Sequence, residues 1–299
     1  MSRPLAVVSV DVDPVDLHLT GYGFKNVPPD ALAYTTSLPR LAEVFAEAGV
    51  KSTLFIIAKD AAEHAGELRK LVSAGHEIAS HSLTHPLPLA KLPDERLREE
   101  IVGSRRELEA AIGKSILGFR APNWDVSTRV LEELAAAGYR YDASILPSLL
   151  LIPGRWLIAL KSSDPAILRL TPWPMALGRL PHARRMRAGS LAVLPVSVTP
   201  DWLRFPIYHT VQYMRPMERF LRQIDVLAAR GEPLFYPLHA VDGLGLEEDG
   251  IDPRLKVHPG MDRKLKAKLE LLRASLAAIA ERFEPVTYEE YLRRIPLAV

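Results

Sequence analysis

The chain has 299 residues, of which 48% are hydrophobic, a formal net charge of +2 and no cysteine. This composition is ordinary for a packed globular protein, and the near balance of charge excludes a strongly basic, nucleic-acid-binding character for the chain as a whole. The absence of cysteine excludes disulfides and thiolate metal sites.

The amino-terminal segment, MSRPLAVVSVDVDP, has one arginine and a short apolar run that is followed at once by acidic residues. A secretory signal has a longer apolar region that ends in small residues, so we interpret this run as the first strand of the fold. No apolar run in the sequence is long enough to span a bilayer. The sequence therefore predicts a cytoplasmic protein.

Segments typical of buried strands alternate with segments typical of amphipathic helices along most of the chain. In chain order we expect a strand at 5–10, a loop rich in Gly and Pro up to about residue 30, a helix at 37–49, a strand at 52–58, a helix at 61–75, a strand at 76–81, a helix at 93–113, a strand at 116–122, a helix at 125–138, a strand at 139–144, a strand at 190–198, a helix at about 213–230, a strand at 233–240 and a helix at 262–283.

This alternation implies parallel strands joined by helical crossovers. It predicts an α/β fold, a distorted (β/α) barrel of about seven strands, in a single domain that covers residues 1–299. An irregular apolar and basic insertion is expected at about 146–190, after the fifth strand. An open, doubly wound sheet is the alternative, but the first loop lacks the glycine-rich pattern that binds dinucleotide phosphates.

The side chains with catalytic chemistry all lie at the ends of predicted strands or just after them. Asp11 and Asp13 follow the first strand, His81 and His85 come at and after the end of the third, and Arg120 and His239 lie at the ends of the fourth and the seventh. The carboxyl ends of barrel strands form the catalytic face, so residues that are far apart in the sequence would converge there. Each residue taken alone could be structural, but so many coincidences at strand ends together favour an active site.

Two histidines and one carboxylate form a usual ligand set for a catalytic divalent metal, with Zn²⁺ as the first choice. The segment HSLTH carries no glutamate that could serve as a base, so the base must come from elsewhere. Asp11 and Asp13 are two apart in a strand and share a face, so Asp13 can bind the metal while Asp11 accepts a proton from water.

These residues resemble the motifs of the polysaccharide deacetylases, also called NodB-homology carbohydrate esterases. The similarity covers most of 5–145 and resumes at 190–292, and the motifs that carry it are SVDVDP, SHSLTHP, GFRAPNW, YRYDASILPS and PLHAVDG. It implies the same barrel fold and removal of an N-acyl group from an amino sugar. It also implies the following roles: metal ligands Asp13, His81 and His85, base Asp11, acid His239, and Arg120 as the residue that orients the base.

The sequence departs from the family pattern in three places. The first motif reads Asp-Val-Asp in place of two adjacent aspartates, and Asn123 and Trp124 replace the usual tyrosine of the third motif. The aspartate and tryptophan that usually support the acid histidine have no match, and Asp201 and Trp202 are the substitutes that the sequence offers. We expect Asn123, Trp124, Asp201 and Trp202 to contact substrate.

The segment 149–187 combines apolar residues and tryptophans with many arginines and a single acid, Asp164. Such a composition suits either a peripheral contact with an anionic membrane or a lid packed on the barrel. The stretches LPVSVTPDW and PLHAVDG also resemble corresponding stretches of undecaprenyl-phosphate aminoarabinose deformylases. We therefore expect the substrate to be an N-acetylated or N-formylated amino sugar that is lipid-linked at the cytoplasmic face of the membrane.

Three alternatives remain open at this stage. A related hydrolase could cleave a small cyclic amide or ureide. A non-haem iron oxygenase could use the same two histidines and one carboxylate, although it needs neither the second aspartate nor the acid histidine. An inactive sugar-binding relative is the third alternative, but every expected catalytic group is present in the sequence.

Overall fold

The computed structural model describes residues 3–161, 184–185 and 191–295. The strands are β1 (Leu5–Val12), β2 (Thr53–Ile56), β3 (Glu77–Ser80), β4 (Gly118–Phe119), β5 (Tyr141–Asp142), β6 (Arg184–Arg185), β7 (Ala192–Val193), β8 (Leu234–His239) and β9 (Glu284–Val286). The α-helices are α1 (Val15–Gly21), α2 (Leu38–Glu47), α3 (Ala65–Ser73), α4 (Asp94–Arg98), α5 (Ser104–Ile112), α6 (Thr128–Ala136), α7 (Leu151–Lys161), α9 (His209–Gln212), α10 (Met217–Ala229), α11 (Leu265–Arg282) and α12 (Tyr288–Arg294).

One curled sheet organises the molecule, with the strand order β6-β7-β5-β4-β3-β2-β1-β8. Seven consecutive strands, from β7 to β8, run parallel, β9 pairs with the start of β1, and β6 adds an antiparallel edge. Beyond β7, the N–H of Ser197 donates to the carbonyl of Phe235 in β8 at 3.2 Å, which brings the two ends of the sheet together. The expected (β/α) barrel of about seven strands is confirmed.

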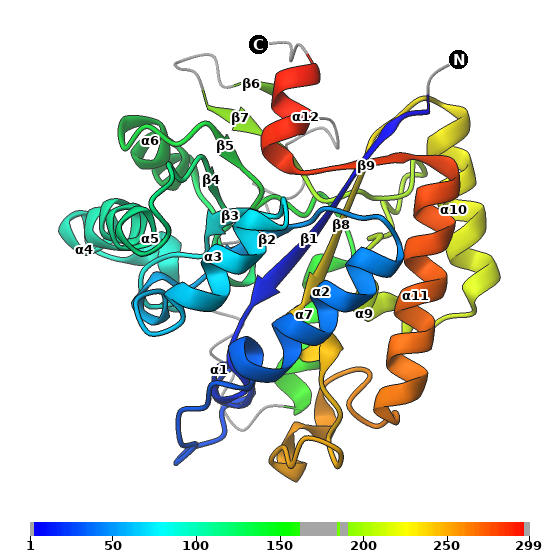
Figure 1. Ribbon diagram of the computed structural model, residues 1–299, viewed down its shortest axis with the longest axis horizontal. Helices are drawn as coiled ribbons and strands as arrows, with labels where there is room; N and C mark the ends of the chain where they lie inside the picture. Colours follow the sequence, from blue (N-terminus) through cyan, green and yellow to red (C-terminus); the bar gives the residue numbers. More distant parts are fainter. Residues whose placement is uncertain (1–2, 162–183, 186–190, 296–299) are drawn as a thin grey trace.

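The sequence of β1, LAVVSVDV, explains its central place in the sheet. All eight residues are buried, as expected for a parallel strand that is covered on both faces. Helices α2 and α11 lie on one side of the sheet, and α3, α5 and α6 cover its other half (Figure 1). The even-numbered residues of β1 pack under these helices, whereas Leu5 and Val7 face an interior cluster that includes Phe55, Phe235 and Tyr288.

Two expectations about local structure are wrong. The segment expected to be a loop up to residue 30 contains α1, whose apolar residues Val15 and Leu19 pack on the loop after β8. The expected strands at 116–122, 139–144 and 190–198 shrink to two residues each. After Phe119 the chain turns into η5 (Pro122–Trp124), where Asn123 and Trp124 have φ of 50° and 54°, so the strand cannot continue.

The described part of the expected insertion at 146–190 consists of residues 146–161, which include helix α7, and of strand β6, and residues 162–183 and 186–190 lie outside the described residues. Among the helices that the structure describes, none has both the length and the apolar character to cross a membrane.

Candidate metal centre and active site

The alternation of side chains along β1 places its carboxylates inside the barrel. Leu5 and Val7 face the interior, so Ser9, Asp11 and then Asp13 project to the same side. Both aspartates are buried. The VDVD pattern therefore presents two carboxylates at the carboxyl end of the central strand, as its spacing predicts.

The two histidines lie in a tight loop that follows β3. Ser82 and His85 adopt φ of 69° and 60°, which is unfavourable for residues with a side chain. The loop is held in this conformation by hydrogen bonds, because the N–H of His85 donates to Ser82 Oγ at 3.0 Å. Backbone strain that is compensated in this way is common at functional sites.

Glu100 fixes the middle of the same loop from a neighbouring helix. It lies in the π-helical turn η4 (Glu99–Gly103) between α4 and α5 and is fully buried. Its Oε2 accepts the N–H groups of Leu83 and Thr84 at 3.0 and 2.8 Å, and its Oε1 accepts the Thr84 hydroxyl at 2.6 Å. Glu100 therefore preorganises the backbone that carries both histidines.

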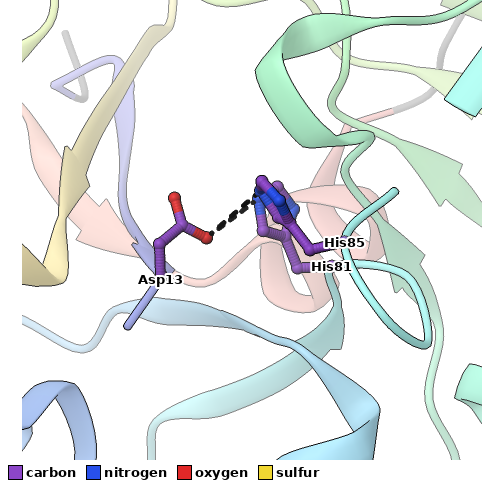
Figure 2. Close-up of side chains that lie close together, drawn as sticks. All are labelled: Asp13, His81 and His85. Atoms are coloured by element: carbon purple, nitrogen blue, oxygen red, sulfur yellow. Dashed lines mark ion pairs between the residues drawn. The ribbon is translucent and has the colours of Figure 1, made fainter. Parts of the chain in front are cut away.

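Asp13, His81 and His85 converge on one point, as Figure 2 shows. Asp13 Oδ1 lies 3.4 Å from His81 Nε2 and 3.6 Å from His85 Nε2. One ligand atom from each residue lies within 4.8 Å of the others. Asp13 Oδ1 is buried and has no hydrogen-bond partner among the described residues, which is the environment that a bound cation would satisfy.

The protonation states of the cluster also fit a cation. His81 Nδ1 lies 2.7 Å from the carbonyl of Arg120 and must donate to it, which leaves Nε2 with a lone pair. Burial lowers the pKa of His81 and lowers that of His85 to about 4, so both imidazoles are neutral near pH 7. Burial raises the pKa of Asp13, a cost that a cation would offset. The donor set thus fits a divalent metal ion.

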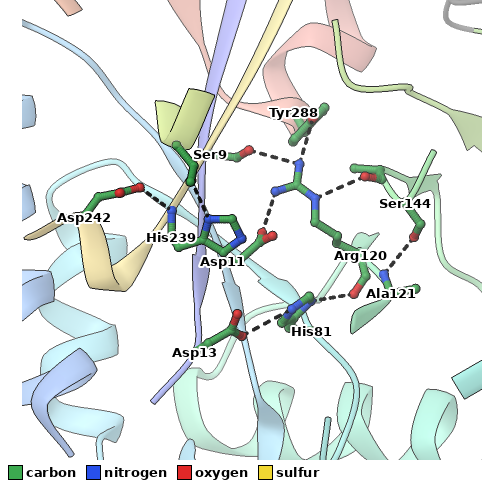
Figure 3. A network of polar contacts seen from close by, with 12 residues as sticks. Ser9, Asp11, Asp13, His81, Arg120, Ala121, Ser144, His239, Asp242 and Tyr288 are labelled. Atoms are coloured by element: carbon green, nitrogen blue, oxygen red, sulfur yellow. Dashed lines mark hydrogen bonds and ion pairs between the residues drawn. The ribbon is translucent and has the colours of Figure 1, made fainter. Parts of the chain in front are cut away.

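Arg120 connects the Asp13–His81–His85 cluster to Asp11 (Figure 3). Its Nη1 binds Asp11 Oδ1 at 2.6 Å, and its Nη2 donates to Ser9 Oγ and Tyr288 Oη at 3.0 and 3.2 Å. The guanidinium also lies 4.0 Å from the centre of the Phe55 ring. Because the carbonyl of Arg120 orients His81, one residue positions both a candidate ligand and the candidate base.

Arg120 keeps Asp11 ionised inside the barrel. Burial alone would raise the pKa of Asp11, but the positive charge of Arg120, with further contributions from His81 and His239, brings this pKa below its ordinary value. A buried charge requires such a partner. Asp11 is therefore a carboxylate that can accept a proton at neutral pH.

His239 lies beside Asp11 at the end of the neighbouring strand. The two residues are paired in the β1–β8 register, so both side chains project to the same side of the sheet. The Nδ1 atom of the His239 ring is 3.4 Å from Thr210 Oγ1, and the backbone N–H of His239 donates to Asp242 Oδ2 at 2.9 Å. Asp242 also accepts the hydroxyl of Tyr213 at 3.0 Å.

The four expected substrate contacts fall in two different places. Trp124 packs on Tyr208 and lies 6.4 Å from His239 between ring centres, and its neighbour Asn123 accepts a hydrogen bond from Arg155 of α7. Asp201 and Trp202 instead lie on an exposed turn, with 78% of Trp202 accessible. The hydrogen bonds that the structure gives His239 go to Thr210 and Asp242, and none of them goes to Asp201 or Trp202.

Sequence reasoning did not find several residues that complete the site. Ser9 and Tyr288 bind Arg120, and Asp242 follows His239 at the three-residue spacing of a capping box, which is a readable signal. His18 and His258 also lie near His239, with ring centres 5.8 and 6.3 Å away. No spacing in the sequence connects these two histidines to the site.

The fold and the cluster together define a parallel β/α barrel with a two-histidine, one-carboxylate centre at the carboxyl ends of its strands. A family model described as polysaccharide deacetylase matches residues 24–141. The chain is 27% identical over 146 residues to a peptidoglycan deacetylase of Helicobacter pylori, a match that covers 48% of this chain and 50% of that protein. It is 32% identical over 101 residues to a chitooligosaccharide deacetylase of Sinorhizobium fredii, which covers 33% of this chain and 46% of that one.

Among solved structures, a polysaccharide deacetylase-like protein from Mycobacterium smegmatis superimposes with a TM-score of 0.63 at 18% identity, over 99% of this chain and 91% of that chain. This likeness supports the fold. Over part of its length the chain is thus similar to the polysaccharide deacetylases, or NodB-homology proteins. It spans about half the length of the curated relatives that it matches.

Proposed function

We propose that the protein is a divalent-metal-dependent hydrolase that removes an N-acyl group, acetyl or formyl, from an amino sugar. The observation that supports this most strongly is the pairing of Asp11 with Arg120 beside the Asp13–His81–His85 cluster. In this arrangement one aspartate, Asp13, would bind the metal, and the other, Asp11, would serve as the base. The deacetylases of Helicobacter pylori and Sinorhizobium fredii agree with an acetylated sugar.

The proposed reaction adds water to the amide carbonyl and releases a carboxylate and a free amine. A divalent ion at Asp13, His81 and His85 would supply Lewis-acid activation. Arg120 occupies Asp11 Oδ1, so Oδ2 is the atom that would accept the proton of the attacking water. His239, which is only partly buried, would donate a proton to the departing nitrogen.

The Asp11→Asn variant tests the assignment of the base. Asparagine keeps the size of the side chain and a carbonyl oxygen for Arg120, but it cannot accept the proton. We expect about a 10²- to 10⁴-fold loss of kcat with N-acyl hexosamines, at unchanged divalent-ion content. Acetate and formate release from matched N-acetyl and N-formyl substrates identifies the acyl group. An Asn variant with wild-type turnover would remove Asp11 from the mechanism.

We further propose that the substrate is lipid-linked and that α7 contacts the membrane surface from the cytoplasmic side. Three α7 residues that share one face of the helix are exposed, namely Trp156 at 56%, Leu157 at 61% and Leu160 at 79%. Arg155, on another face of the helix, is buried and donates to the carbonyl of Asn123 at 3.4 Å. The exposed apolar face is thereby attached to the η5 loop, and aromatic and leucine side chains suit a lipid interface.

Vesicles that contain anionic lipids test this contact. Leu157→Glu with Leu160→Glu should abolish co-sedimentation and leave hydrolysis of a soluble substrate unchanged. Val226→Glu on α10, where the valine is 42% exposed, is the matched control and should bind like the wild type. Equal binding by the α7 variant and the control would exclude α7 as the membrane contact.

A further inference from the structure

A second group of histidines lies next to His239 and has no part in the mechanism above. Helix α1 and the loop after β8 meet at the carboxyl end of β1 and β8 (Figure 1). Val15 and Leu19 of α1 pack there with Leu244, Leu255 and other apolar residues of that loop. This packing brings together His18 from α1 and His258 from the loop.

The three imidazoles form a compact group. The ring centres of His18 and His258 are 5.0 Å apart, and His239 lies 5.8 Å from His18 and 6.3 Å from His258. All three contacts are edge-to-face. The group therefore borders the residue that would protonate the leaving nitrogen.

His18 and His258 each keep a buried ring nitrogen without a hydrogen-bond partner among the described residues, in both cases Nε2. His258 is only 8% exposed, and its other nitrogen, Nδ1, lies 3.3 Å from the hydroxyl of Tyr22. Nδ1 is thus turned towards Tyr22, and Nε2 lies on the far side of the ring. A buried polar atom without a partner costs about 1–3 kcal/mol, so a ligand that satisfies both nitrogens would be favoured.

The nearby charged side chains, Asp242 and Lys268, form their hydrogen bonds with other groups and not with these two Nε2 atoms. Asp242 accepts hydrogen bonds from the Tyr213 hydroxyl and from the backbone N–H of His239. Lys268 donates its ammonium protons to the carbonyls of Val241 and Leu244 at 2.8 and 2.6 Å. Within the described residues, the metal-binding geometry is met by Asp13, His81 and His85 and not by this second group. An imidazole Nε2 that carries the ring proton is a hydrogen-bond donor, and two such donors match a group with several acceptor oxygens.

We propose that His18 and His258 form a subsite for an anionic group of the substrate, a phosphate ester or a carboxylate on the same sugar as the acyl amide. This inference rests on the proposed hydrolase function, because it places the anion next to the leaving nitrogen at His239. A phosphate ester agrees with a lipid-linked sugar, and a carboxylate would point to an acidic sugar.

Three soluble substrates test the subsite: N-acetylglucosamine, its 1-phosphate, and N-acetylmuramic acid, which carries a carboxylate. Each is assayed with the wild type, with the double variant His18→Phe/His258→Phe and with His18→Gln/His258→Gln. We expect the Phe variant to raise KM roughly tenfold or more for one anionic substrate, with KM for the neutral sugar unchanged. Gln places an amide near the position of Nε2 and should restore part of the loss.

Binding of inorganic phosphate, followed through the histidine NMR signals, separates failure of the subsite from failure of the proposed function. If no sugar is hydrolysed but phosphate shifts the His18 and His258 signals, and the Phe variant loses this binding, the subsite stands and the hydrolase proposal fails. If the neutral sugar is hydrolysed and the Phe variant changes KM equally for all three substrates, the subsite is wrong. Phosphate binding of equal strength to wild type and Phe variant would also overturn it.

Discussion

Replacement of Arg120 by methionine is the most informative perturbation of this site. Arg120 is fully buried and is the side chain that pairs with Asp11. Methionine has a similar length and fits an apolar site but has no charge. The substitution leaves the Asp11 carboxylate buried without its cation, which is among the most destabilising changes that a single substitution can make.

The expected cost follows from two independent arguments. Removal of one partner from a buried ion pair typically costs about 3–5 kcal/mol. The protein can avoid the buried charge by protonating Asp11, whose ordinary pKa is 3.8. At pH 7 this takes about three pH units at about 1.4 kcal/mol each, so the cost is limited to about 4 kcal/mol.

The two arguments also predict how the cost depends on pH. In the wild type the pKa of Asp11 is lowered, so its contribution to stability is present above the unfolded-state pKa and is lost as the pH falls through the folded-state pKa. In Arg120→Met burial is no longer opposed, the folded-state pKa rises, and protonation becomes easier in acid. The penalty should therefore shrink by about 1.4 kcal/mol for each pH unit below 7.

Urea unfolding at pH 5, 6 and 7, with a chelator present so that metal binding does not contribute, measures this penalty. A double-mutant cycle with Asp11→Asn supplies the control, because Arg120→Met should cost much less when no carboxylate is left unpaired. A penalty below about 1 kcal/mol, or one that is equal at every pH and in both backgrounds, would refute the reasoning.

Three further predictions concern residues around the centre. Glu100→Ala removes the carboxylate that accepts hydrogen bonds from the loop carrying the two histidines. Although all three candidate ligands remain, calorimetry should show a divalent-ion affinity that is weaker by roughly 10- to 100-fold. An unchanged Kd would contradict this. Burial raises the pKa of Glu77 to about 7, so between pH 4.5 and 7 the folded state binds more protons than the unfolded state. The free energy of unfolding should therefore fall by roughly 3 kcal/mol from pH 4.5 to 7. Glu77→Gln should flatten this pH dependence, and an unaltered slope would exclude Glu77 as its source. Lys268→Met removes the ammonium donor from the Leu244 carbonyl, whereas the Val241 carbonyl keeps the N–H of Leu244. The substitution should cost about 1–3 kcal/mol and lower kcat without changing ion affinity, and an unchanged kcat would show that Lys268 does not position the acid.

The parts of this structure that the sequence predicted are those with a local periodic signal. The two-residue spacing of Asp11 and Asp13 predicted the face that they share, and the alternation of strand-like and helix-like segments along the chain predicted the barrel. The convergence of His81 and His85 with Asp13 follows from the common edge at which parallel strands end.

The parts that the sequence did not predict depend on tertiary contacts. Helix α1 lies in a segment rich in proline and glycine, and its few apolar residues gain a partner only when the loop after β8 folds over them. His18 and His258 meet through that packing, so no spacing could connect them. The role expected of Asp201 and Trp202 rested on residue type alone, and the structure places Trp202 on an exposed turn.

The central claim is that Asp13, His81 and His85 hold one divalent ion while Asp11 does not. The most direct test measures ion stoichiometry and affinity, by elemental analysis and calorimetry, for the wild type and for Asp13→Asn, His81→Ala and Asp11→Asn. We predict one ion per chain in the wild type and in Asp11→Asn, and little or none in the other two variants. A wild-type protein that takes up no ion, or equal uptake by all four proteins, would contradict the account.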